Sequence, residues 1–388
     1  MAGTSPESAA TAWQVRLRSM ARPVLDSSLV PSQLDPVLKR IARRRRRSEG
    51  VPSGVDFPTL EEVCRKEWGR RLKRVWHTPI SSWRGGGAAF VWLEMEGRVT
   101  KRVVVKASSY EADVFVASTE TLVEAGPPEL WVYRKAEPIL RAFLPRTILA
   151  AEAASGRSGV YVLEDLSWDY GRAWDHGRGG NTLRDGVMGM FRMHTALASA
   201  VETHGDEELI RYDAAFSRGL IAYAENAITA YDGGGDDSIR ERVLGAWPRL
   251  ERAYLDDEFD VSTDGVPIHG DYNGSNVFVH RRDRRVKAVD WEWTGYGTPH
   301  ADLASYLKKA STDVVSWALD LLAERDESRT RHEHERIFLR SMLERALWDA
   351  SLNAMQHTSD RGDFGYLGPR VNRALVTSLR SLDQLRNG

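Results

Sequence analysis

Three polar side chains in the second half of the chain have types and spacings that could serve one chemical purpose. Asp271 and Asn276 stand five residues apart, and Asp290 follows fourteen residues after Asn276 at the end of an apolar run. A proton acceptor and oxygen ligands for a metal-bound phosphate must surround one point in a phosphoryl transfer, and this layout supplies both. We interpret the segment as a candidate active site.

Short runs that favour β-structure flank these three residues. The runs cover residues 266–269, 277–280 and 286–289, and a charged turn at 281–285 separates the last two. Asp271, Asn276 and Asp290 are then expected at strand ends, on connecting segments. Polar groups on such segments can converge on a ligand without being buried unpaired.

The pattern resembles that of the aminoglycoside phosphotransferase and choline kinase-like family, which shares the protein-kinase fold. In this family His-Gly-Asp is followed by four residues, Asn, and an apolar strand that ends in Asp-Trp-Glu. The chain has these at residues 269–271, Asn276 and residues 290–292. The resemblance implies a two-lobed α+β fold, with a small antiparallel β-rich N-lobe and a larger, mainly helical C-lobe.

The resemblance also implies a role for each residue. Asp271 would accept or orient the proton of a substrate hydroxyl. Asn276 and Asp290 would supply oxygens to Mg²⁺, a hard cation that prefers carboxylate, carbonyl, water and phosphate oxygens. His269 is expected to brace the loop rather than act as a base. The alternative is a pair of polar turns in an ordinary α/β domain.

A predicted hairpin lies upstream, with strands at residues 91–95 and 102–106. Three glycines precede it, Gly85, Gly86 and Gly87, where backbone amides could approach a phosphate without side-chain obstruction. A flexible entry into the hairpin is the alternative. Lys106 ends the second strand and resembles the kinase lysine that pairs with the α and β phosphates.

This lysine requires a carboxylate partner, and the resemblance indicates Glu129. Pro127 and Pro128 favour a helix start immediately before it. A glutamate in a first helical turn also complements the helix dipole, which is its alternative role. The competing partners in the sequence are Glu120, Glu124 and Glu137.

The segment 160–166 resembles the strand and linker that join the two kinase lobes. Backbone groups of Glu164, Asp165 and Leu166 are expected to bind adenine there, because main-chain N–H and C=O groups can do so with any side chains. An ordinary core strand with a turn is the alternative. Two further residues are expected to support the structure, His194 on a helix and Asp302 beneath the catalytic loop.

Composition favours a globular enzyme of the cytoplasm. The 388 residues are 42% hydrophobic and 28% charged, which is enough for a large core and more than one lobe. A net charge of −1 indicates no general attraction to nucleic acid or to an anionic membrane. The single cysteine, Cys64, excludes an intrachain disulfide and most cysteine-rich metal sites. Residues 1–17 lack an apolar signal core, and no run approaches the ~20 apolar residues of a membrane span.

Along the chain we expect three parts. Residues 1–78 form a helical extension, residues 79–165 the nucleotide-binding N-lobe, and residues 166–388 the catalytic and substrate-binding C-lobe. The extension contains seven basic residues within 39–47, including five consecutive arginines. A solvated helix or linker is favoured for this run, with contact to an anionic partner as the alternative.

The sequence thus predicts a kinase that uses ATP and Mg²⁺ to phosphorylate a hydroxyl of a small molecule. An antibiotic or another secondary metabolite is the preferred acceptor, and choline, amino-alcohol and sugar acceptors stay open. Trp291, Trp293 and Tyr296 could hold a quaternary ammonium group, although packing near the site is favoured. An inactive nucleotide-binding regulator is the competing class. A protein kinase is disfavoured because Gly270 replaces the arginine of protein kinases. The oligomeric state is left open.

Overall fold

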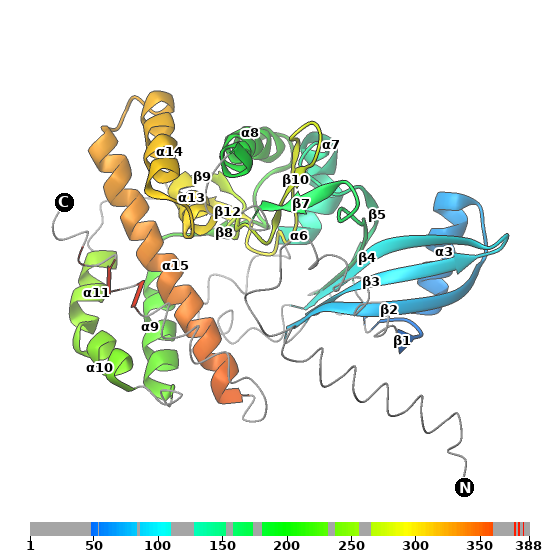
Figure 1. Ribbon diagram of the computed structural model, residues 1–388, viewed down its shortest axis with the longest axis horizontal. Coiled ribbons are helices and arrows are strands. Elements are labelled where there is room, and N and C mark those ends of the chain that lie inside the picture. Colours follow the sequence, from blue (N-terminus) through cyan, green and yellow to red (C-terminus); the bar gives the residue numbers. More distant parts are fainter. Residues whose placement is uncertain are drawn as a thin grey trace, which may run out of the picture.

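The computed structural model divides the chain into a β-rich N-lobe and a helical C-lobe (Figure 1). The structure describes residues 48–52, 54–83, 86–109, 128–152, 158–173, 181–231, 237–255 and 265–359, together with 376–377, 379–380 and 383. The basic run at 39–47 and the expected helical part before it lie outside these residues. The expected α+β fold with two lobes is confirmed.

The N-lobe is built on a six-stranded sheet with the strand order β1-β2-β3-β4-β6-β5. Every neighbouring pair in this sheet is antiparallel. The strands are β1 (Ser48–Glu49), β2 (Leu72–Trp83), β3 (Gly86–Met95), β4 (Val99–Ser109), β5 (Thr147–Glu152) and β6 (Ser158–Glu164). The predicted hairpin is therefore present as β3 and β4, joined at Gly97, whose φ of 77° suits glycine.

Alternation along β4 gives the sheet two different faces. Val103 and Val105 are buried in a core with Leu60 and Cys64 of helix α3 (Phe57–Trp68). Because successive side chains of a strand point to opposite faces, Lys106 lies on the other face. Helix α3 thus covers one face of the sheet, and Lys106 projects from the face that the helix does not cover.

Local signals set the ends of α3. The Asp56 carboxylate accepts the N–H of Thr59 at 2.8 Å, and the helix ends at Gly69 with φ 64°. The helix therefore begins at Phe57. The expected boundary at residue 78 falls inside β2, because this strand completes the N-lobe sheet from Leu72 onwards.

A helical segment follows between β4 and β5. It consists of α6 (Pro128–Trp131), a π-helical turn η2 (Val132–Ala136) and α7 (Glu137–Leu140). Its buried side chains, including Trp131 and Leu140, belong to the main core of the C-lobe. The segment therefore links the sheet of the N-lobe to the helical part of the molecule.

The C-lobe contains two small sheets that carry the predicted site. One has the order β11-β10-β7 and the other β8-β12-β9. The strands are β7 (Tyr170–Arg172), β8 (Ile210–Arg211), β9 (Val266–Ile268), β10 (Val277–His280), β11 (Val286–Ala288) and β12 (Gly295–Gly297). The predicted strand, turn and strand at 277–289 are confirmed by the antiparallel pairing of β10 with β11.

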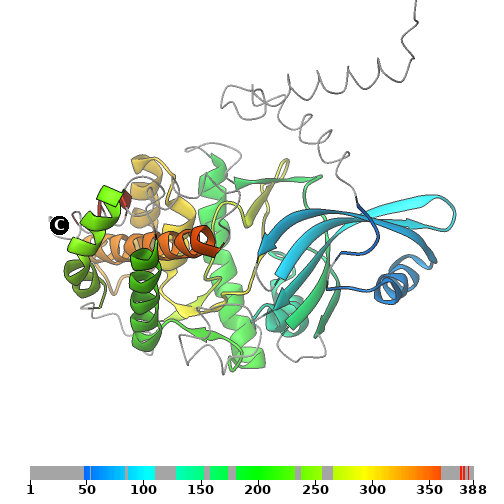
Figure 2. The ribbon, with the colours of Figure 1, turned by 90° about the horizontal axis from the view of Figure 1, so that it is seen from below.

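Helices surround these sheets, and α15 runs through the helical end of the molecule in both views (Figures 1 and 2). The helices are α8 (Asn181–His204), α9 (Ala214–Ala230), α10 (Asp237–Gly245), α11 (Trp247–Leu255), α13 (Pro299–Leu307), α14 (Thr312–Arg325) and α15 (Arg331–Ser359). Within the part of the chain that the structure describes, none of the helices could span a bilayer, because none combines sufficient length with sufficient apolar character.

Candidate active site

The loop between β9 and β10 places the catalytic candidates, and its shape depends on Gly270. This residue has φ 80°, and a Cβ atom there would lie 1.9 Å from the carbonyl oxygen of Trp293. Only glycine fits this backbone conformation and this contact. The Gly270 that distinguishes the chain from protein kinases is therefore required by the fold of its own loop.

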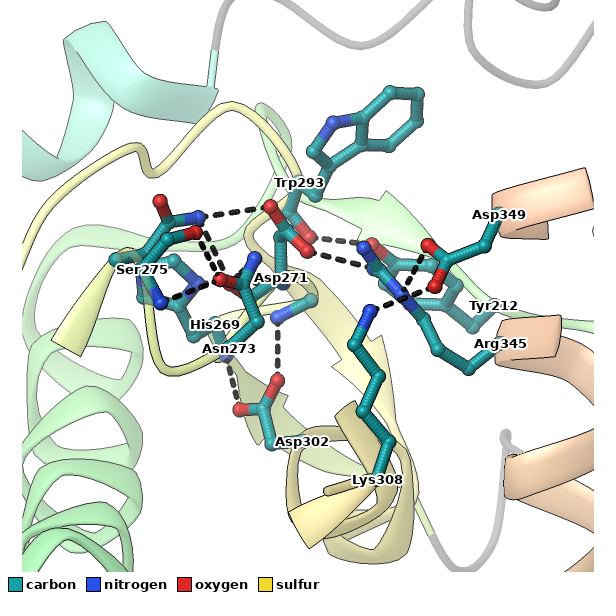
Figure 3. Close-up of polar contacts among 12 residues, drawn as sticks. Tyr212, His269, Asp271, Asn273, Ser275, Trp293, Asp302, Lys308, Arg345 and Asp349 are labelled. Atoms are coloured by element: carbon teal, nitrogen blue, oxygen red, sulfur yellow. Dashed lines mark hydrogen bonds and ion pairs between the residues drawn. The ribbon is translucent and has the colours of Figure 1, made fainter. Parts of the chain in front are cut away.

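Asp302, in the first turn of α13, supports the loop from below (Figure 3). Its carboxylate accepts the backbone N–H groups of His269 at 2.8 Å and Gly270 at 2.9 Å. It also lies 2.8 Å from Nε2 of His194. Burial would raise the pKa of Asp302, but its bonds to His194 and His269 outweigh burial and lower it. The predicted supporting roles of Asp302 and His194 are confirmed as contacts.

His269 is fully buried in the loop that it begins. Its Nε2 lies 3.2 Å from the carbonyl oxygen of Val289, and its ring is 4.4 Å from that of Trp291. Burial lowers the pKa of His269 despite the nearby carboxylates. These contacts tie the catalytic loop to the segment that carries Asp290, as a bracing residue would.

Asp271 and Asn276 meet across the loop. Nδ2 of Asn276 donates to Oδ2 of Asp271 at 2.8 Å and to its backbone carbonyl at 3.1 Å. Because the amide nitrogen faces Asp271, the amide oxygen of Asn276 points elsewhere and is the atom that could bind a cation. The two residues are thus placed together with different atoms available for chemistry.

Asp290 lies beside Asn276 because β10 and β11 pair. The backbone N–H of Val289 donates to the carbonyl of Asn276 at 3.0 Å, which brings the two loop ends together. Asp290 itself has φ 71°, a left-handed conformation that is uncommon for residues other than glycine, although aspartate adopts it more readily than most. This conformation turns the chain sharply at the candidate metal ligand.

Lys106 reaches this group from the N-lobe. Its Nζ lies 2.8 Å from Oε2 of Glu129, 2.5 Å from Oδ1 of Asp290 and 2.8 Å from Oε1 of Glu292. Burial opposes the charged form of Lys106, but the three carboxylates outweigh it and hold its pKa well above the ordinary value. The predicted pairing with Glu129 is confirmed, and the contact with Glu292 is an addition that the sequence did not indicate.

The donor set around Asp290 is compatible with Mg²⁺. Among the described residues, no cluster of three or more His, Cys, Asp or Glu side chains could hold a metal ion by itself. Asp290 and Asn276 offer only oxygen atoms, which suits a cation that keeps several water and phosphate ligands. The chemistry of the residues therefore fits a metal that arrives with a nucleotide.

Two of the three predicted glycines lie next to Lys106. Gly86 and Gly87 open β3, pair with Trp83 and Ser82, and Gly87 pairs with Ala107 on the other side. Gly85 lies outside the described residues, as do the competing partners Glu120 and Glu124. The start of β3 therefore lies beside the end of β4 that carries Lys106.

The segment between the lobes follows β6. Glu164 accepts from Nζ of Lys287 at 2.9 Å and from the backbone N–H of Arg146 at 3.0 Å. Asp165 accepts the N–H of Ser167 at 2.9 Å and forms an ion pair with Arg102. The carboxylates of both residues therefore bind partners within the protein. The backbone N–H of Glu164 donates to the backbone carbonyl of Arg146.

Residues 132–336 match the phosphotransferase enzyme family. This range covers more than half of the chain. The chain belongs to this family. It is an ATP-dependent phosphotransferase with an alcohol group as acceptor. The matched range contains Asp271, Asn276 and Asp290, whereas Lys106 and Glu129 precede it. No curated protein matches the chain in sequence.

Three solved structures are similar to the chain, and the first of them, with a TM-score above 0.5, has the same fold. The GDP and kanamycin complex of APH(2")-IIia has 10% sequence identity and a TM-score of 0.51, with 85% of this chain and 98% of that chain covered. Macrolide 2'-phosphotransferase type I has 16% identity and a TM-score of 0.47, with 84% and 97% covered. Plasmodium vivax ethanolamine kinase has 9% identity and a TM-score of 0.46, with 81% and 84% covered. At these identities the likeness concerns the fold.

The phosphotransferase has a further contact at Asp271 that the sequence did not indicate. Nη1 of Arg345, on α15, lies 2.6 Å from Oδ1 of Asp271 (Figure 3). Arg345 also pairs with Asp349, which in turn pairs with Lys308. The carboxylate of Asp349 therefore lies between two cations. The spacing of Arg345 and Asp349 predicts that they pair on a helix, but it does not predict the contact between Arg345 and Asp271.

The tryptophans that follow Asp290 differ in position. Trp291 is fully buried, so it cannot contribute to an aromatic site for a quaternary ammonium ligand. Trp293 packs edge-on against Trp348 of α15, with ring centroids 4.5 Å apart. Tyr296 lies under the guanidinium of Arg211. Trp291 therefore packs in the core near the site, as the favoured interpretation expected.

Two histidines of α15 differ in burial. His334 is buried and lies 3.0 Å from Nε2 of His300, whereas His332 is exposed. The two side chains point to different sides of the helix, which is incompatible with joint metal binding.

Proposed function

We propose that this phosphotransferase transfers the γ-phosphate of ATP, bound with Mg²⁺, to a hydroxyl of a small molecule, with Asp271 as the catalytic base. The observation that carries the proposal is the meeting of the two lobes at Asp290. Nζ of Lys106, from β4, lies 2.5 Å from Oδ1 of Asp290, beside the loop that holds Asp271. A triphosphate bound there would contact both lobes.

Each residue then has a defined task. Asp271 accepts the proton of the acceptor hydroxyl as its oxygen attacks the γ-phosphorus in line, and the bond from that phosphorus to the leaving ADP oxygen breaks. Lys106, held by Glu129, pairs with the α and β phosphates in place of its present contacts to Asp290 and Glu292. Asn276 and Asp290 would hold Mg²⁺, which supplies positive charge to the phosphate oxygens.

The nucleotide base is assigned to the segment between the lobes. The carboxylates of Glu164 and Asp165 are used within the protein, so recognition there falls to the backbone. The backbone N–H of Glu164 donates to Arg146, and the carbonyl of Leu166 accepts from the N–H of Tyr170. The other backbone groups of Glu164, Asp165 and Leu166 are the proposed contacts for adenine. The backbone amides of Gly86 and Gly87, at the start of β3, would contact the phosphates beside Lys106.

For the acceptor, we propose an antibiotic or another secondary metabolite. APH(2")-IIia, which has the same fold, forms a complex with kanamycin. This supports a hydroxylated natural product as the first class to test. Choline, ethanolamine and glucosamine belong in the same panel as representatives of amino-alcohol and sugar acceptors.

The experiment measures ADP formation from ATP and Mg²⁺ with this panel and with a generic protein substrate. We expect one class of small molecule to stimulate turnover, and we expect Asp271→Asn to lower kcat by about 10²- to 10⁴-fold, the usual contribution of a positioned base. Affinity for nucleotide should stay unchanged, because Asp271 does not contact it in this assignment. Asp313→Asn, at an exposed position in the first turn of α14, is the matched control.

Two results would contradict the proposal. Nucleotide binding without turnover in the presence of any acceptor would favour an inactive nucleotide-binding regulator. Undiminished turnover in Asp271→Asn would remove the role of this carboxylate as base.

A further inference from the structure

Helix α15 places a basic side chain directly on the candidate base. We propose that Arg345 is a positioning residue that fixes the Asp271 carboxylate for phosphoryl transfer, and that Asp349 and Lys308 hold Arg345 in place. The inference rests on the proposed role of Asp271. It concerns a residue beyond the range 132–336 that matches the family.

The two oxygens of Asp271 are held from two different elements. Oδ2 accepts from Asn276 in its own loop at 2.8 Å, and Oδ1 accepts from Nη1 of Arg345 at 2.6 Å. A carboxylate with one donor can still turn about its last bond, whereas two donors on opposite oxygens fix its plane. The direction in which Asp271 presents its remaining lone pairs to an acceptor therefore depends on α15.

Arg345 is itself fixed by a chain of alternating charges (Figure 3). Its Nε lies 3.1 Å from Oδ1 of Asp349, one helical turn later, and Oδ2 of Asp349 lies 2.6 Å from Nζ of Lys308. The side chains of Arg345 and Asp271 are each only 17% exposed. Charges held this far from water interact strongly, so the four groups are expected to move together.

Lys308 and Asp302 lie at opposite ends of the same short helix, α13, with Lys308 at its C-cap. Asp302 binds the backbone of the catalytic loop at Gly270. Through Lys308, Asp349 and Arg345, the other end of α13 is connected to the carboxylate of Asp271. Helix α13 thus supports the backbone of the catalytic loop at one end and, through the ion pairs, the side chain of Asp271 at the other.

A purely structural ion pair would have a different consequence from a positioning one. If Arg345 acts only on the fold, its loss should lower activity whatever residue occupies position 271. If it acts through Asp271, its loss should matter only when Asp271 is present. Double-mutant cycles separate the two cases, since residues in one network give non-additive effects.

The experiment compares wild type with Arg345→Gln, Asp271→Asn and the double variant. ADP formation is measured with an acceptor from the panel, or with water as acceptor if none stimulates turnover. We expect Arg345→Gln to lower kcat about 10- to 100-fold, the usual effect of misplacing a reacting group, with KM for ATP within about twofold. In the Asp271→Asn background the same change should have no further effect beyond about twofold.

Two further variants control for folding. Arg345→Lys keeps a positive charge and should restore part of kcat, while thermal unfolding reports whether each protein is folded. Arg336→Gln removes an exposed arginine from the same helix and should behave as wild type. Asp349→Asn should lower kcat in the same direction as Arg345→Gln but by less.

The outcomes distinguish this inference from the proposed function. The positioning role is wrong, and the proposed function stands, if Asp271→Asn is inactive but Arg345→Gln has the kcat of wild type. The same conclusion holds if the double variant loses the full fold-change of Arg345→Gln in addition to that of Asp271→Asn. A faster Arg345→Gln would show that Arg345 blocks the base and would also overturn the inference. If the wild type does not turn over, or Asp271→Asn matches it, both proposals fall together.

Discussion

Lys106 lies among three acidic side chains, and burial raises the pKa of one of them, Glu129, to about 8. Three carboxylates, from Glu129, Asp290 and Glu292, lie within 2.8 Å of its ammonium group. Burial would raise the pKa of Asp290, but the charge and hydrogen bond of Lys106 outweigh it and lower that pKa. An ionised Asp290 that lies among further carboxylates is suited to a divalent cation, because such a cation would neutralise the excess charge.

Asp290→Asn tests this assignment. We expect wild type to bind a non-hydrolysable ATP analogue more tightly with Mg²⁺ than with EDTA, and we expect the variant to lose most of this difference. A loss of about tenfold in affinity corresponds to about 1.4 kcal/mol. Calorimetric titration in both buffers measures it, with Asp313→Asn as the control. An equal gain from Mg²⁺ in Asp290→Asn would show that this carboxylate does not hold the metal.

At the scale of elements, sequence predicts what is local. The strands at 277–280 and 286–288 follow from short apolar runs separated by a charged turn, and their pairing brings Asn276 next to Val289. Arg345 is 74 positions from Asp271 and meets it only because α15 packs against α13. No local pattern encodes that contact. Residue 78 likewise falls inside β2, a strand that is recognised by its pairing with β3 rather than by a local pattern.

The contact between α13 and α15 also buries a pair of histidines. Nε2 of His300 lies 3.0 Å from Nδ1 of His334, and Oγ1 of Thr298 lies 2.7 Å from Nδ1 of His300. Burial, followed by the charges of His334 and Arg329, lowers the pKa of His300 from 6.5 to about 3. The folded protein therefore keeps His300 neutral where the unfolded chain would protonate it.

This shift predicts acid destabilisation with a defined sign. Between about pH 6.5 and 3 the unfolded chain binds the proton more readily, so the contribution of His300 to stability is full above pH 6.5 and declines as the pH falls. From pH 8 to 5.5, we expect wild type to lose about 1 kcal/mol more than His300→Gln in its free energy of unfolding. Urea unfolding at both pH values measures the difference. His332→Gln, at an exposed position, should keep the wild-type dependence, and the same dependence in His300→Gln would refute the argument.

At the scale of the whole molecule, charged side chains connect the two lobes in addition to the apolar core that both lobes share. Arg102 of β4 binds Ser167 at 2.6 Å and pairs with Asp165 in the segment between the lobes. Lys287 of β11 binds Glu164 at the end of β6, and Lys106 binds Asp290. A nucleotide that contacts Lys106 and a metal on Asp290 would add a further connection between the lobes, so its binding should stabilise the entire fold.

Lys106→Met tests this coupling. A ligand that binds only the folded protein at 100 times its Kd stabilises it by about 2.7 kcal/mol, which raises Tm by several degrees. We expect wild type to show this rise with Mg²⁺ and a non-hydrolysable ATP analogue, and Lys106→Met to lose it, whatever its own Tm in the absence of ligand. Lys101→Met removes an exposed lysine from the same strand and should retain the full rise. Because the comparison is made within each variant, a lower starting stability of Lys106→Met does not affect it. An undiminished rise in Lys106→Met would place the phosphates away from this ammonium group.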